Sequence, residues 1–169
     1  MKLAPRTNLI CGILFTSVLG SLLHFVYEWT GENPLAALFS PVNESVFEHC
    51  KLLFFPALLY TLFEIRILSR RSRNFLTARL AGILLGLLFL LASYYTYIGI
   101  TGMESLAIDI LIFILSAVLS FALSRFFELR CPKLSLPLPV SMGLYLVLLL
   151  LFLLFTFRPP GLPLFWPPD

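Results

Sequence analysis

Residues 43–51 hold an unusual concentration of side chains that could do chemistry. They bring together two carboxylates, an amide, a hydroxyl, an imidazole and an ammonium group: Asn43, Glu44, Ser45, Glu48, His49 and Lys51. The apolar residues 52–62 follow directly, so these groups lie at or just inside a membrane boundary. Ionisable side chains at that depth are costly to keep, and their presence predicts a functional site.

The composition of the chain is that of a membrane protein. Of 169 residues, 59% are hydrophobic and 12% are charged, whereas a soluble domain carries about 25% charged residues. Mean hydropathy is +0.95. A membrane-spanning helix needs about 20 apolar residues. The sequence therefore predicts an all-α fold, a single membrane domain over residues 1–169 with five transmembrane helices at about 8–29, 41–68, 75–98, 104–127 and 140–157.

Charges alternate between successive connections. Basic residues flank one set of helix ends (Lys2, Arg6, Arg66, Arg70, Arg71, Arg73, Arg79, Arg125, Arg130 and Lys133), and acidic residues flank the other (Glu28, Glu32, Glu44, Glu48 and Glu104). The positive-inside rule then predicts a multi-pass protein of the cell membrane with the N-terminus inside and the C-terminus outside. The basic runs are short and lie next to the membrane, so topology or contact with anionic lipid explains them, and no nucleic-acid partner is expected.

The second segment carries signals for an early helix start. Ser40 is a suitable N-cap and Pro41 suits the first helical position, so a helix over 41–68 is predicted. Such a helix would be roughly 42 Å long, so its first two turns would lie at the outer surface or in a cavity. Its polar half could face the headgroups or a polar cavity within the bundle.

Polar residues on the other helices are predicted to lie at the same outer depth. They include both histidines of the chain and are contributed by all five segments: His24, Glu28, Tyr94, Tyr95, Asp109, Thr156 and Arg158 join residues 43–51. Asp109 lies more than a turn inside an apolar segment, where an unpaired carboxylate needs a proton or a partner.

Three uses fit such a cluster. In the first, His24, His49 and Asp109 bind a divalent metal such as zinc, and Glu44 or Glu48 acts as general base in hydrolysis of a lipid or acyl substrate. Ser45 is a further catalytic candidate, Lys51 or Arg158 would hold a phosphate or carboxylate, and Glu28, Asn43 and Tyr94 would contact the ligand. The second use is ion or proton translocation through Asp109 and His49, which would need an oligomer because the inner halves hold few polar groups. The third is a non-catalytic site for a partner or small ligand.

Two resemblances bear on these alternatives. Ser45-x-x-x-His49 with the embedded Asp109 faintly resembles the alkaline ceramidase and adiponectin-receptor-like membrane hydrolases, which implies zinc hydrolase chemistry; that superfamily has seven spans and a closing His-x-x-x-His that this sequence lacks. A closer resemblance rests on residues 24–29, the Ser-Pro-Val-Asn-Glu-Ser-Val-Phe-Glu-His run at 40–49, Tyr-Tyr-Thr-Tyr at 94–97, and residues 156–160 and 163–165. These motifs resemble a family of small bacterial polytopic membrane proteins of unknown function. This resemblance implies the membrane fold and the importance of residues 41–49, and it implies no reaction.

Overall fold

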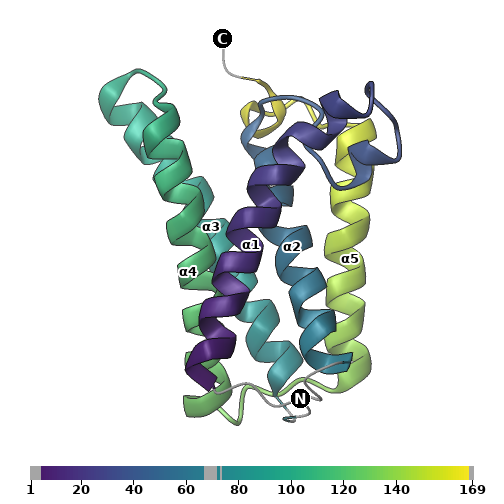
Figure 1. Cartoon of the computed structure of the whole chain (residues 1–169), viewed down its shortest axis with the longest axis vertical. Coiled ribbons are helices and arrows are strands. Elements are labelled where there is room, and N and C mark those ends of the chain that lie inside the picture. The colour runs from purple at the N-terminus through teal and green to yellow at the C-terminus, as the bar shows by residue number, and fades with distance from the viewer. Residues whose placement is uncertain (1–4, 67–71, 73, 168–169) are drawn as a thin grey trace.

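The computed structural model describes residues 5–66, 72 and 74–167. Within these ranges the chain forms five long helices and two short 3-10 turns: α1 (Pro5–Trp29), η1 (Ala36–Leu38), α2 (Val46–Arg66), α3 (Phe75–Thr101), α4 (Leu106–Arg130), α5 (Leu138–Phe157) and η2 (Pro163–Phe165) (Figure 1). All five long helices are long and apolar enough to cross a membrane, which confirms the predicted all-α bundle. The predicted end of the second span at 68, and the basic residues Lys2, Arg70, Arg71 and Arg73, lie outside the described ranges.

Helix α2 is the central element of the bundle. In the most apolar stretch of α2, 67% of the residues are buried. In the corresponding stretches of α1 and α5 the buried share is 17% each. Leu53, Phe54 and Ala57 on α2 are fully enclosed. The outer helices turn apolar side chains such as Leu14 and Leu146 outward, as expected for a surface covered by lipid tails.

Helices α3 and α4 form a closely packed hairpin. A Cβ atom placed on Gly82 or Gly86 would collide with the backbone or side chains of α4 at Ser116, Ser120 and Ser124. The small-xxx-small spacing of these glycines thus lets the two helices approach closely.

The start of α2 corrects one prediction. The helix begins at Val46, not at Pro41, because the Ser40 hydroxyl is used elsewhere: it donates to Leu23 O and accepts from Tyr27 N, both on α1. Ser45 is the cap instead. Its carbonyl accepts the first helical hydrogen bond from His49 N at 3.2 Å, and its hydroxyl lies 3.4 Å from Glu48 N. The other four predicted spans coincide with α1, α3, α4 and α5, with bounds that differ by a few residues.

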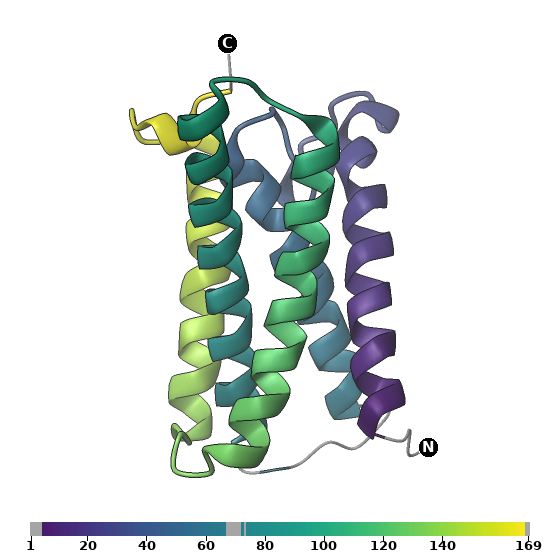
Figure 2. The same ribbon diagram turned by 90° about the vertical axis from the view of Figure 1, so that its left-hand side faces the viewer.

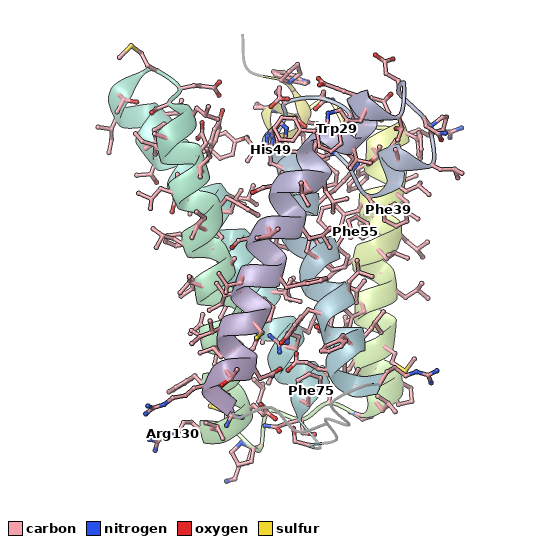
Figure 3. The ribbon with its side chains drawn as sticks, in the orientation of Figure 1. Trp29, Phe39, His49, Phe55, Phe75 and Arg130 are labelled. Atoms are coloured by element: carbon pink, nitrogen blue, oxygen red, sulfur yellow. The ribbon has the colours of Figure 1, made fainter. Side chains whose placement is uncertain are left out.

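The ends of the bundle differ in character. The upper end in Figure 1 holds the end of α1, the start of α2, the α3–α4 turn and the end of α5, and the lower end holds the start of α1 and the α4–α5 connection. Figure 2 shows the same arrangement from the side. Most of the residues that could do chemistry lie at the upper end, where Figure 3 labels His49 and Trp29.

Candidate metal centre

Three side chains converge at the upper end from three separate elements. His24 lies near the end of α1, Glu44 in the loop before α2 and His49 in the first turn of α2. The two Nε2 atoms are 3.2 Å apart, and Glu44 Oε2 lies 3.5 Å from His24 Nε2 and 3.3 Å from His49 Nε2. We call these residues the triad. In a tetrahedral zinc site with bonds of about 2.0–2.1 Å, neighbouring ligand atoms lie about 3.3 Å apart. The triad therefore has the spacing of three corners of such a site, and a fourth corner would remain for water.

The orientation of the His49 ring is fixed by the backbone. Its Nδ1 lies 2.9 Å from Ser45 O, so Nδ1–H donates to this carbonyl and Nε2 faces His24 and Glu44. A histidine that binds a metal through one nitrogen commonly donates the other N–H to a carbonyl in this way. The Ser45 carbonyl oxygen thus fixes the orientation of the His49 ring within the triad.

Glu44 is held in its ionised form. Its hydrogen bond with His49 lowers the pKa of the carboxyl below the usual value of 4.5, against the opposing effect of partial burial. An anionic oxygen beside two imidazole nitrogens is a donor set suited to zinc or another borderline divalent ion. Glu44 is predicted as a general base, and its oxygen lies where a metal ligand would also fit.

A buried ion pair holds the loop that carries Glu44. The Lys51 ammonium lies 2.6 Å from Glu48 Oε2, 2.9 Å from Ala37 O and 3.3 Å from Ser40 O. Glu48 Oε2 also accepts from Val42 N at 2.9 Å. These bonds fasten residues 37–42 to α2.

Glu48 also ties α2 to the last helix. Its Oε1 accepts from Thr156 Oγ1 of α5 at 3.1 Å, so both carboxylate oxygens have partners. The Lys51 ammonium has three N–H groups, each with a partner, and the residue is fully buried. Both residues therefore position the loop, and the roles of Glu48 as base and Lys51 as substrate anchor stay predictions.

Asp109 lies beside the triad and is not part of it. Its carboxylate accepts a hydrogen bond from the Tyr97 hydroxyl. α4 carries Asp109 in its first turn, and the upper end of the α3–α4 hairpin leans away from α1 (Figure 1). The ligand role of Asp109 stays a prediction. Tyr94 similarly donates to Glu104 on the same hairpin.

The remaining predicted site residues lie at the rim. Glu28, Asn43 and Arg158 are exposed. Asn43 Oδ1 accepts from Ser45 N at 2.9 Å, so the amide shapes the turn before α2. Ser45 itself is buried, and its hydroxyl caps the helix rather than facing the triad.

A second polar cluster at the lower end was missed in the sequence. Glu64 of α2 accepts from Asn8 Nδ2 at 2.6 Å and pairs with Arg79 of α3, and Tyr60 donates to Asn8 Oδ1 at 2.9 Å. Arg79 is counted in the sequence among the basic residues that flank helix ends, but it lies in the first turns of α3 and is buried. The sequence does contain a signal for this pair. Glu64 lies near the end of the second span and Arg79 near the start of the third, so the two lie at equal depth on antiparallel helices.

The fold and the triad define a multi-pass helical membrane protein with a His–Glu–His cluster at one end of its bundle. The chain belongs to a family of unknown function (DUF6512), whose sequence profile matches residues 2–167. This confirms the resemblance to an uncharacterised family. Searches of curated proteins and of solved structures found no match.

Proposed function

We propose that this protein is a membrane metalloprotein in which His24, Glu44 and His49 bind one divalent cation, with zinc as the best-suited ion. The observation that carries the proposal is the 3.2 Å separation of the two Nε2 atoms together with the anchoring of His49 Nδ1 to Ser45 O. The Nε2 atoms of His24 and His49 are then both available as metal ligands.

The chemistry we propose is hydrolysis. Two imidazoles and one carboxylate, with an open fourth position, form the ligand set of several zinc hydrolases, and zinc lowers the pKa of a bound water to about 7. Asp109 lies outside the triad, and its carboxylate would be the candidate to receive the proton of that water. Tyr97 holds this carboxylate in place.

The substrate class that fits the location is a lipid or acyl compound. The triad lies where the spans meet the upper interface, and its side chains are partly accessible: 31% for His24, 29% for His49 and 60% for Glu44. The exposed rings of Phe25 and Trp29 stack beside His24 on the same helix, with centroids 5.6 Å apart. Aromatic rings at this depth sit well among headgroups and acyl chains. With the predicted topology, the site faces the outside of the cell membrane.

A second candidate is a metal-free site that binds a ligand or partner without chemistry. A distance of 3.2 Å between two ring nitrogens is also a hydrogen-bond distance. In this case one imidazole donates to the other, and Glu44 accepts from whichever ring carries a proton.

Elemental analysis of the purified protein separates the two candidates. We expect about one zinc, manganese or iron per chain in the wild type, loss of the metal in a His24→Ala/His49→Ala variant, and retention in Glu28→Gln. Glu28 is the matched control because it lies on α1 one turn beyond His24 and is exposed. A folded wild type that takes up no metal from a zinc buffer would refute the proposal. Asp109→Asn should keep the metal and lose hydrolysis.

A further inference from the structure

The lower end of the bundle contains an arginine whose hydrogen bonds are incomplete. Arg79 is 6% exposed and pairs through Nη2 with Glu64, which is fully buried. Its guanidinium lies over the ring of Phe121, with the central carbon 4.3 Å from the centroid. Its Nε and Nη1 atoms are buried and have no hydrogen-bond partner among the described residues. Unpartnered N–H groups of a buried cation are costly and call for an acceptor.

A pocket lies beside this guanidinium, between α1, α3 and α4. The pocket has a cavity volume of about 20 Å³. A cavity of this size holds one water-sized group, such as a single phosphate oxygen. The polar and charged lining comes from Arg79, Arg125, Ser124, Asn8 and Glu128.

Two arginines and one glutamate form the charged lining of the pocket. Arg79 and Arg125 contribute +2 and Glu128 contributes −1, and Glu64, which pairs with Arg79, brings the sum of the four charges to zero. Arg125 Nη1 lies 3.1 Å from Glu128 Oε2, and the Arg125 side chain is 28% exposed, so it stands at the rim. Glu64 balances Arg79 from the side of α2 without lining the pocket.

We propose that this pocket binds the phosphate group of an anionic phospholipid. One phosphate oxygen enters the pocket and accepts from Arg79, and the rest of the headgroup lies outside it, next to Arg125 at the rim. Arginine is well suited to oxyanions because its N–H groups form charge-assisted hydrogen bonds. The pocket lies at the end of the bundle that the charge pattern assigns to the cytoplasmic leaflet, where basic pockets between helices bind anionic headgroups. This inference does not depend on the metal site.

Thermal melting of the full chain in neutral detergent tests the proposal. Phosphatidylglycerol, phosphatidylcholine and inorganic phosphate are titrated separately. Glu64→Gln/Arg79→Gln removes both members of the pair and leaves no unpaired buried charge, and Leu9→Phe narrows the pocket while keeping every charge, since Leu9 also lines it. Arg130→Gln is the control, because Arg130 is exposed near the same end of α4 and does not line the pocket.

The expected result is that phosphatidylglycerol binds about tenfold more tightly than phosphatidylcholine, the size of one charge-assisted hydrogen bond. Leu9→Phe and the double variant should lose this preference, and Arg130→Gln should keep it. If the double variant does not fold, Leu9→Phe alone decides. Equal protection by inorganic phosphate would keep the oxyanion site but overturn its assignment to lipid. Equal affinity for the two lipids would overturn the proposal, and so would an equal loss of the phosphatidylglycerol preference in Arg130→Gln. Water would then be the occupant of the pocket.

Discussion

The Nε2 atoms of His24 and His49 lie 3.2 Å apart although 25 residues separate them in the sequence. The close approach of α1 and α2 makes this possible. A Cβ atom on Gly20, one turn before His24, would lie only 2.5 Å from the backbone oxygen of Leu52. Gly20 therefore sets the distance between the two helices that carry the histidines.

Replacing Gly20 should separate the histidines. We expect Gly20→Val to push α1 away from α2 and to weaken zinc binding at least about tenfold, because one lost metal ligand is worth more than 1.4 kcal/mol. Competition with a zinc chelator measures the affinity. Gly143→Val is the control, since a Cβ atom on Gly143 meets nothing within 4 Å. Unchanged zinc affinity in Gly20→Val would contradict this role.

The buried pair of Lys51 and Glu48 should dominate the stability of the upper end. Lys51→Met leaves Glu48 as an unpaired buried charge and should lower the free energy of unfolding by about 3–5 kcal/mol. Lys51→Met/Glu48→Gln should recover part of that loss. Arg125→Gln breaks the more exposed pair with Glu128 and should cost only about 0–1 kcal/mol. Denaturant unfolding in detergent gives the free energy of unfolding of the three variants. A Lys51→Met variant that is no less stable than Lys51→Met/Glu48→Gln would contradict the role of the buried pair in stability.

The fold followed from the sequence because its cause is local. Long apolar runs between charged connections define membrane helices whatever their neighbours do, and the five spans were predicted on that basis. The placement of most site residues at one end of the bundle followed in the same way. Which groups pair with one another did not, because pairing depends on how helices rotate and lean.

Ser40 and Asp109 illustrate the limit. Ser40 followed by Pro41 is a good helix start on local grounds, but the Ser40 hydroxyl bonds to Leu23 and Tyr27 of α1. A competing local signal, the Ser45-x-x-Glu48 pattern of a capping box, marks the true start. Asp109 is predicted as a ligand from its depth. In the structure its carboxylate accepts a hydrogen bond from Tyr97 on α3.

Ser40 should also matter more for stability than an equally buried serine elsewhere. Ser40→Ala removes the acceptor of Tyr27 N and the donor to Leu23 O, so we expect a loss of about 1–3 kcal/mol. Ser116→Ala is the comparison, because the Ser116 hydroxyl donates to Ile112 O within its own helix. Thermal melting with a chelator present measures the stability of the two variants. Equal losses of stability would contradict the role of Ser40 in holding the loop before α2 against α1.

The Glu44 carboxyl should leave a signature in acid. Its pKa is lowered in the folded protein by the hydrogen bond with His49, so its contribution to stability is present above the ordinary value of 4.5 and is lost as the pH falls through the lowered pKa. The melting temperature of the metal-free wild type should therefore exceed that of Glu44→Gln near pH 5–6, and the difference should vanish in stronger acid. The effect should be small because Glu44 is 60% exposed. A difference that persists below the lowered pKa would contradict this assignment.

X-ray absorption at the zinc edge of the zinc-loaded protein tests the central claim most directly. We predict a first shell of nitrogen and oxygen at about 2.0–2.1 Å, with the outer-shell signal of two imidazoles and no sulfur. In His24→Ala/His49→Ala the imidazole signal should disappear with the bound zinc. A shell with sulfur at about 2.3 Å, or a spectrum that is unchanged in the double variant, would show that the triad does not hold the metal.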